Sequence, residues 1–293
     1  MNIAVYGKKI TTKTDFNDFE EIFQIIREFG WNIVVELSLK NDLAKRNSIY
    51  EQLATFNSFT DLTAGFDCAL SIGGDGTFIK TVSYVRNSNV PIIGINLGRL
   101  GFLANINRNQ IVQSFKLLED KQFTYQERAL LCVETENNLF ENDNFALNEV
   151  TIQRKNTASM IAIDTALNGE FLNTYWADGL IISTPSGSTA YNLSCGGPII
   201  APNCNVHILT PIAAHNLNVR PMVVPNDLPL KLSVNGRASS HLVSIDGKSK
   251  EIKNGEEILV KKAPFTIRTI EFENATFLET IRNKMLWGLD KRN

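Results

Sequence analysis

The sequence has few cysteines and few histidines, and neither set has the spacing of a known site. The four cysteines are Cys68, Cys132, Cys195 and Cys204. They are too few for a disulfide scaffold in a chain of this length, and their spacing does not match a zinc site. The three histidines are His207, His215 and His241, and no nucleophile-elbow or metal motif surrounds them. The sequence therefore supports neither a zinc site nor a Ser/His/Asp triad, and it favours a reducing, cytoplasmic compartment.

The chain also lacks an excess of charge and a long hydrophobic run. It has 29 basic and 31 acidic residues, a formal charge of −2, which provides no field for a nucleic-acid backbone or an anionic membrane. No run approaches the roughly 18 apolar residues of a membrane-spanning helix. The stretch from Met1 to Ile10 has no apolar core of a signal peptide. We therefore expect a cytoplasmic protein that binds neither nucleic acid nor a membrane.

Length and composition are those of an ordinary globular protein. Hydrophobic residues make up 43% and charged residues 20% of the 293 residues, which argues against disorder and low-complexity structure. A chain of this length is expected to form two domains rather than one compact core.

The first 120 or so residues alternate short apolar runs with amphipathic stretches. The predicted strands cover residues 3–6, 32–37, 67–72 and 90–95, and the predicted helices cover residues 16–29, 42–53 and 78–86. Thr14 or Asp15 is expected to cap the first helix, and Gly30 is expected to end it. The alternation predicts a parallel sheet with right-handed crossovers, and it places ligands at the carboxyl ends of the strands.

After about residue 120 the pattern changes to short strands separated by turn dipeptides. These dipeptides, which tolerate the positive φ angles of tight hairpins, are Asn168-Gly169, Asn235-Gly236, Asp246-Gly247 and Asn254-Gly255. Residues 265–272 predict a strand, and residues 277–288 predict a helix with one apolar side formed by Leu278, Ile281, Met285 and Leu286. The fold class predicted is an α/β N-terminal Rossmann-like domain with a parallel sheet, plus a β-rich C-terminal domain. Periodicity alone does not say which domain the last residues join.

The segment Gly73-Gly74-Asp75-Gly76-Thr77 lies between a predicted strand and a predicted helix. Its glycines allow a sharp turn and a close approach to a ligand, and amides at the helix start suit phosphate oxygens. Asp75 holds a metal, accepts a proton from a hydroxyl nucleophile, or simply complements the helix dipole. Lys80, one helical turn after Thr77, reaches a phosphate or is an ordinary surface lysine. The segment matches neither the Walker A motif nor the dinucleotide fingerprint.

Three further segments carry polar or aromatic groups with a choice of roles. Residues 94–103 follow the fourth predicted strand and form a second wall of the same crevice, where Phe102 lies against a flat ring or packs in the core. Asn148 and Glu149 offer an amide and a carboxylate to sugar hydroxyls or to an adenine amino group. Residues 178–191 run from an apolar strand into a hydroxyl-rich loop and a helix start, which suits an anionic or polyhydroxylated ligand or is a simple cap.

Together these segments resemble the NAD kinase family, whose members use ATP to phosphorylate the adenosine-ribose 2′-hydroxyl of NAD. The matching segments are GGDGT at 73–77, NLGRLGFL at 96–103, NE at 148–149, DGLIISTPSGSTAYNLSCGGPI at 178–199 and TPIAAHNLNVRPMVVP at 210–225. The first motif alone also resembles motifs of related lipid kinases and 6-phosphofructokinases, whereas the ordered set of five is specific.

The resemblance implies a cytoplasmic ATP-dependent NAD kinase that forms a homodimer or homotetramer. It implies a nucleotide-phosphate domain over residues 1–120, rejoined by residues 270–293, and a β-rich NAD-binding domain over residues 121–269. Asp75 matches the general base, and the chemistry of ATP adds Mg²⁺ or another divalent cation. The nucleotide-binding and NAD-binding positions that match are Gly73, Gly74, Gly76, Thr77, Phe102, Asn148, Glu149, Asp178, Thr189, Ala190, Tyr191, Asn192, Leu193 and Ser194. Lys80 is added to the nucleotide-binding candidates from its position one helical turn after Thr77.

One position departs from the family pattern, and two other functions stay open. Trp176 stands where family members frequently have a basic residue, two positions before Asp178, so the preference between NAD and NADH is open. No motif reports whether the donor is ATP or polyphosphate. A lipid kinase is disfavoured because the chain has no basic amphipathic stretch. A non-catalytic NAD(P)-sensing protein is disfavoured because a sensor gains nothing from Asp75 beside phosphates.

Overall fold

The chain divides into two compact units. The computed structural model describes residues 1–293 except 64, 99–100, 156–158, 274–275 and 288–293. Unit 1 is Met1–Glu127 with Ile267–Asn293, and unit 2 is Arg128–Thr266. The boundaries fall inside two long strands, β7 (Thr124–Thr135) and β18 (Glu257–Glu271), so each of these strands contributes to both units.

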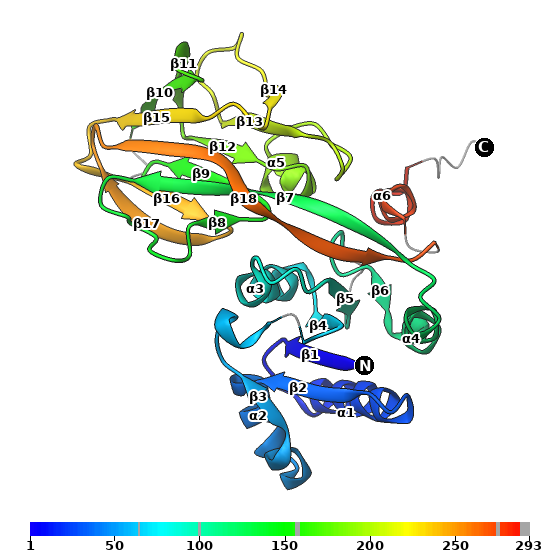
Figure 1. Ribbon diagram of the computed structural model, residues 1–293. Helices are drawn as coiled ribbons and strands as arrows, with labels where there is room; N and C mark the ends of the chain where they lie inside the picture. Colours follow the sequence, from blue (N-terminus) through cyan, green and yellow to red (C-terminus); the bar gives the residue numbers. More distant parts are fainter. Residues whose placement is uncertain (64, 99–100, 156–158, 274–275, 288–293) are drawn as a thin grey trace. The chain divides into compact units, whose positions relative to one another are not determined.

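Unit 1 is built on a parallel sheet (Figure 1) with the strand order β3-β2-β1-β4-β5. The strands of unit 1 are β1 (Asn2–Gly7), β2 (Asn32–Glu36), β3 (Ala54–Phe56), β4 (Cys68–Gly73), β5 (Ile92–Asn96) and β6 (Ile106–Asn107). The register pairs Ile3 with Cys68 and Ala69 with Ile92, and the end of β18 joins β5 at Thr269. The predicted parallel α/β unit is therefore confirmed, although β3 and β6 were not predicted.

Side chains cap the first turn of three helices of unit 1, α1, α2 and α6. They are α1 (Lys13–Glu28), α2 (Leu37–Ala44), α3 (Asp75–Val85), α4 (Ile111–Glu119) and α6 (Phe277–Met285), with short 3-10 turns at Ser48–Gln52, Phe59–Asp61 and Arg108–Gln110. The N-cap of α1 is Thr12, so the prediction of Thr14 or Asp15 was wrong. Asp15 is instead the third helical residue, and its carboxylate accepts from the backbone of Thr12 to complete a capping box.

Helix α2 begins earlier than predicted because a carboxylate caps it. The Glu36 side chain accepts a hydrogen bond from Leu39 N at 2.9 Å, so the helix starts directly after β2 and ends at Ala44, and residues 48–52 form a separate 3-10 turn. Helix α3 likewise begins at Asp75 and not at Phe78. The glycine turn therefore leads straight into the first turn of α3.

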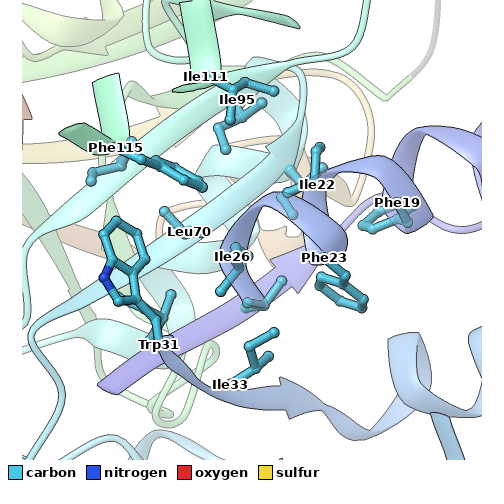
Figure 2. Close-up of a cluster of buried hydrophobic side chains, with 14 of the residues drawn as sticks. Phe19, Ile22, Phe23, Ile26, Trp31, Ile33, Leu70, Ile95, Ile111 and Phe115 are labelled. Atoms are coloured by element: carbon cyan, nitrogen blue, oxygen red, sulfur yellow. The ribbon is translucent and has the colours of Figure 1, made fainter. Parts of the chain in front are cut away.

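A hydrophobic core fixes the sheet of unit 1 beneath its helices. Figure 2 shows Phe19, Ile22, Phe23 and Ile26 of α1 gathered with Leu70 and other sheet residues. Each of these α1 side chains is at most 1% exposed, and burial of one such side chain contributes about 1.5–3 kcal/mol. This packing holds β1 and β4 in place, and the candidate site begins where these two strands end.

Unit 2 is rich in antiparallel strands, as predicted. One six-stranded sheet has the order β14-β13-β12-β9-β16-β17, and β11, β10 and β15 join β18 in a second sheet. The remaining strands are β8 (Phe145–Ala146), β9 (Glu149–Gln153), β10 (Ile161–Leu167), β11 (Glu170–Ala177), β12 (Gly179–Ser183), β13 (Val206–Ile212), β14 (Met222–Pro225), β15 (Leu230–Asn235), β16 (Ser240–Ile245) and β17 (Lys248–Lys253).

Two of the four predicted turn dipeptides have positive φ at both residues. These are 168–169, between β10 and β11, and 246–247, between β16 and β17. Of the other two pairs, only Gly255 has a positive φ angle, +76°. The helix predicted after the hydroxyl-rich loop is a 3-10 turn at Ser186–Thr189 followed by the short α5 (Tyr191–Ser194).

Helix α6 belongs to unit 1 and differs from the predicted helix. It ends at Met285, and Leu286 adopts a left-handed conformation with φ +57°, while Gly288 lies outside the described residues. Leu278 and Leu286 are 64% and 65% exposed and Ile281 is buried, so the predicted apolar side is only partly buried, and Leu286 lies just beyond the helix. Among the described residues, no helix has both the length and the apolar character needed to cross a lipid bilayer.

Candidate active site

The glycine turn after β4 lines a large cavity of unit 1. A Cβ atom on Gly73 would lie 2.3 Å from Thr77 Oγ1, so only glycine fits there. The cavity has a volume of about 650 Å³ and is lined by Tyr6, Gly7, Lys8, Lys9, Glu36, Ser38, Leu39, Asp42, Gly74, Gly76, Thr77, Lys80 and Tyr84. It lies where β1, β2 and β4 end, which is where a parallel sheet is expected to bind ligands.

Three lysines contribute positive charge to this cavity. Lys8 pairs with Asp15 at 2.6 Å, and this contact holds the pKa of the Asp15 carboxyl well below its usual range. In the part of the chain that the structure describes, no ion pair engages Lys9 or Lys80. The sequence analysis identified Lys80 but missed Lys8 and Lys9, although their position directly after the first strand was the available signal.

Two tyrosines and a buried glutamate form another part of the same cavity. The rings of Tyr6 and Tyr84 lie 5.2 Å apart, and Glu36 is only 4% exposed. Burial, aided by the nearby Glu36 carboxylate, raises the pKa of Tyr84 to about 12. The Tyr84 hydroxyl donates to the Glu36 carboxylate, with 3.5 Å between Tyr84 Oη and Glu36 Oε1.

Asp75 turns toward the loop after β5. Its Oδ2 accepts from Phe102 N at 2.9 Å, and its Oδ1 accepts from Leu103 N and Ala104 N at 3.0 Å each. A Cβ atom on Gly101 would lie 2.0 Å from Oδ1, so the loop needs glycine at this position. Because a carboxylate has about four acceptor positions, one position on Oδ2 remains for a further donor. Two residues of the matching loop motif, 99 and 100, lie outside the described residues.

A lysine from α6 lies beside the same carboxylate. Lys284 Nζ is 3.8 Å from Asp75 Oδ2 and 4.2 Å from the centroid of the Phe102 ring. The structure thus brings together Asp75, Phe102 and Lys284 from three distant parts of the chain. The sequence analysis did not identify Lys284, because no motif surrounds it.

In unit 2, Asn148 and Glu149 carry buried polar atoms, and Glu149 lines a second cavity. Asn148 Oδ1 and Glu149 Oε2 are both buried and have no hydrogen-bond partner among the described residues. Burial and the neighbouring Asp246 raise the pKa of Glu149 to about 7. The cavity, of about 280 Å³, is lined by Glu149, Thr151, Gln153, Tyr191, Ser244, Gly247 and Ser249. Buried polar atoms are rarely left unpaired, so these two point to a ligand.

The hydroxyl-rich loop hydrogen-bonds within the protein. Ser183 Oγ donates to Asn148 O at 3.2 Å, and Thr184 Oγ1 donates to Leu147 O at 2.5 Å. Thr189 Oγ1 donates to Ser186 O at 3.2 Å. The first two hydroxyls thus fix the backbone of 147–148.

The predicted residues from 189 to 194 differ in exposure. Tyr191 is 37% exposed, and its hydroxyl accepts from Gln153 Nε2 at 3.1 Å. Asn192 is fully buried, and its amide group bonds to Ser188 O, Pro198 O and Thr210 Oγ1. Thr189, Ala190 and Leu193 are half-buried and Ser194 is exposed. Tyr191 lies at the second cavity, while the Asn192 side chain holds the loop together.

Asp178 is paired with a cation that the motif comparison did not identify. Arg154 Nη2 lies 2.9 Å from Asp178 Oδ2, and the Arg154 N–H donates to the Asp178 carbonyl oxygen. Trp176, two positions before Asp178, is 53% exposed. A basic group therefore does lie beside Asp178, supplied from the end of β9.

The described residues contain no group of three or more His, Cys, Asp and Glu side chains arranged to hold a metal ion. A divalent cation that accompanies a triphosphate takes many of its oxygen ligands from phosphates and water. The metal-binding side chains among the described residues are therefore consistent with a cation carried by a nucleotide, and not with a metal cage built by the protein.

Comparison with known proteins gives a consistent result. Two family models match the chain, the ATP-NAD kinase N-terminal domain over residues 10–123 and the ATP-NAD kinase C-terminal domain over residues 147–272. NAD kinases from Flavobacterium psychrophilum, Flavobacterium johnsoniae and Christiangramia forsetii are 46%, 44% and 42% identical, each over 100% of both chains.

Two solved structures share the fold. A crystal structure of yeast NADH kinase complexed with NADH aligns with a TM-score of 0.85 and 24% identity, over 99% of this chain and 88% of that one. An NAD kinase from Archaeoglobus fulgidus in complex with ATP aligns with a TM-score of 0.75 and 24% identity, over 98% of this chain and 99% of that one. These likenesses support the two-part fold class that the sequence predicted.

Proposed function

This chain belongs to the NAD kinase family, and from that premise we propose that it transfers the terminal phosphoryl group of ATP to the 2′-hydroxyl of the adenosine ribose of NAD. The observation that carries the proposal is the turn at 73–77. This turn lines a lysine-bearing cavity and also holds the Asp75 carboxylate with one acceptor position on Oδ2 left over.

Asp75 acts as the general base of this reaction. The 2′-oxygen attacks the terminal phosphorus, the bond from that phosphorus to the bridging oxygen breaks, and the hydroxyl proton passes to Asp75 Oδ2. General-base assistance contributes about 10²–10⁴ in rate, and much of the remaining acceleration in phosphoryl transfer comes from positioning and charge neutralisation. A divalent cation, Mg²⁺ or another, supplies charge neutralisation when bound with ATP.

The cavity of unit 1 binds the phosphates of the donor. Gly73 permits the tight turn, Gly74, Gly76 and Thr77 border the cavity, and Lys80 adds a positive charge. Lys8 and Lys9 extend this positive surface from the end of β1. Backbone amides at a helix start and lysine side chains are both suited to phosphate oxygens.

NAD is recognised by the remaining family-motif residues. Phe102 supplies an aromatic face, and Asn148 and Glu149 supply the unpaired buried oxygens. The other contacts come from Asp178, Thr189, Ala190, Tyr191, Asn192, Leu193 and Ser194. In domain terms, residues 1–120 with 270–293 form the nucleotide-phosphate domain and residues 121–269 form the NAD-binding domain. We further propose a cytoplasmic homodimer or homotetramer.

The test is an endpoint assay with NAD or NADH as acceptor and ATP or polyphosphate as donor, read out by an NADP-specific dehydrogenase. Wild type is expected to make NADP from NAD, ATP and Mg²⁺, and Asp75→Asn is expected to lose about 10²–10⁴ in rate. Asp120→Asn, at an exposed position after α4, is the matched control and keeps its rate. An Asp75→Asn protein as active as wild type would remove Asp75 from the role of base.

An NAD-binding measurement and an assay with lipid vesicles as acceptor, added to this panel, separate the two alternative functions. A folded protein that binds NAD but transfers no phosphate from any donor would favour a sensor. A phosphorylated product formed only from lipid acceptors in vesicles would favour the function of a lipid kinase.

A further inference from the structure

The carboxylate of Asp246 accepts hydrogen bonds from three consecutive backbone amides. Leu147 N lies 2.7 Å from Oδ2, and Asn148 N and Glu149 N lie 2.9 and 3.0 Å from Oδ1. Asp246 sits in the tight turn between β16 and β17, with φ +46°. This turn therefore holds a segment that is 97–99 residues away in the sequence.

The backbone groups of that segment are used almost completely within unit 2. Its N–H groups donate to Asp246, the carbonyl oxygens of Leu147 and Asn148 accept from the hydroxyl-rich loop, and the Glu149 carbonyl accepts from Asp246 N at 3.1 Å. A Cβ atom on Gly187 would lie 2.0 Å from Asn148 O, so the loop packs tightly there. The side-chain atoms Asn148 Oδ1 and Glu149 Oε2 are nevertheless left without a partner among the described residues. A backbone held so firmly around unpaired side-chain atoms is the arrangement of a prepared binding site.

The same arrangement occurs around Asp75 in unit 1. Both aspartates precede a glycine, and both accept from three consecutive amides of a distant segment. Asp75 holds 102–104, which includes Phe102, and Asp246 holds 147–149, which includes the Asn-Glu pair. In each unit, therefore, an aspartate fixes the backbone of a segment to which the proposed function assigns NAD contacts.

We propose that Asp246 is a positioning residue, which fixes the backbone at 147–149 so that Asn148 and Glu149 meet NAD in one orientation. This inference rests on the proposed function. Asp246 acts through the three amides and needs no contact with the reacting atoms. Its removal is therefore expected to weaken NAD recognition selectively and to leave use of the donor intact.

The charges around Asp246 agree with this role. Burial raises the pKa of Asp246 to about 6, opposed by the three amide hydrogen bonds and by Lys248. Glu149 faces it from β9, and the backbone of Tyr191 bonds to Glu149. Lys248 is itself paired with Asp143 at 3.0 Å. Above about pH 6 Asp246 is thus ionised, the form that accepts all three hydrogen bonds.

The first test measures the KM values for NAD and ATP in Asp246→Asn. The amide retains one acceptor oxygen and places an NH₂ group against a backbone N–H, so the KM for NAD is expected to rise at least about tenfold. The KM for ATP is expected to stay within about twofold of wild type. Asp164→Asn is the matched control in unit 2, because Asp164 is exposed on β10 and its carboxylate accepts a hydrogen bond from Thr174 Oγ1.

The outcomes separate this inference from the proposed function. If wild type makes no NADP from NAD and ATP, the proposed function fails. If wild type makes NADP and Asp246→Asn keeps its KM for NAD, or changes both KM values equally, the positioning role is overturned.

A second variant keeps the inference testable if Asp246→Asn does not fold. Glu149→Gln removes the other group that titrates in the same range, and its KM for NAD is then measured from about pH 5 to pH 8. The KM is expected to rise as the pH falls through about 6, because protonated Asp246 accepts fewer hydrogen bonds. A flat profile would contradict the proposed role of Asp246.

Discussion

Lys284 lies 3.8 Å from the carboxylate of Asp75, with its ammonium group also over the ring of Phe102 at 4.2 Å. The lysine comes from the last turn of α6, and Asp75 comes from the first turn of α3. Both side chains are about one-third exposed, at 34% and 31%. A cation at this place offsets the negative charge that accumulates when a triphosphate approaches a carboxylate.

Replacement of Lys284 by alanine is expected to lower kcat about tenfold, since the compensating charge beside Asp75 is lost. Lys284→Arg keeps the charge and is expected to recover most of the rate. Lys116→Ala, at an exposed position on α4, is the control. The comparison is made by steady-state kinetics at saturating NAD and ATP, and a normal kcat in Lys284→Ala would contradict the prediction.

Two glycines of the same loop are expected to respond differently to alanine. A Cβ atom on Gly101 would lie 2.0 Å from Asp75 Oδ1, whereas the nearest heavy atom to a Cβ on Gly98 is Asn96 Oδ1 at 3.9 Å. Gly101→Ala therefore displaces the carboxylate without changing its chemistry. We expect a loss of about 10²-fold in kcat, because small errors in position are costly in catalysis.

Gly98→Ala is the matched control and is expected to keep kcat within about twofold of wild type. Thermal unfolding of both variants separates a local displacement from a general loss of stability. Equal kinetics in the two alanine variants would show that the position of Asp75 does not limit the reaction.

The sequence predicted the residues of the site that lie in local motifs. The glycine turn at 73–77 was found because a strand, a turn and a helix follow one another there, and hydrophobic periodicity reports that order. The same periodicity placed α3 three residues late, because Asp75, Gly76 and Thr77 form the first turn of α3 without apolar spacing.

The residues that the sequence analysis missed act through tertiary contacts. Lys284 meets Asp75, and Asp246 meets 147–149, only because the fold brings together segments far apart in the chain. Arg154 beside Asp178 was likewise hidden, since the expected basic residue was sought two positions before Asp178. The sequence analysis predicted Asp246 to be a hairpin-turn residue. That prediction is correct for its backbone, but it says nothing of what its carboxylate binds.

Lys9 is expected to contribute to donor binding and not to the chemical step. It lines the cavity of the glycine turn, and no ion pair in the described part of the chain engages it. Lys9→Ala is therefore expected to raise the KM for ATP about tenfold with little change in kcat, because one contact to a phosphate of ATP is lost. Lys13→Ala, at an exposed position in α1, is the control. A reduced kcat with an unchanged KM for ATP would contradict this assignment.

His207 makes the stability of the chain depend on pH. It is fully buried on β13, and neither ring nitrogen has a hydrogen-bond partner among the described residues. Burial, with a smaller effect of Lys262, lowers its pKa to about 4. The unfolded chain binds a proton near pH 6.5 and the folded chain does not until about 4, so stability falls as the pH drops between these values.

His207→Leu is expected to remove this dependence, because leucine places no ionisable group in the buried strand. We compare the free energy of unfolding of the variant with that of wild type at each pH. The variant's advantage over wild type should be about 2 kcal/mol larger at pH 5 than at pH 8, because the pKa of His207 differs between the folded and the unfolded chain. Urea unfolding at both pH values measures the effect, and His215→Gln, at an exposed position, is the control. A stability difference that is the same at pH 5 and pH 8 would mean that His207 takes up its proton over the same pH range in the folded and the unfolded chain, and would contradict a pKa lowered by burial.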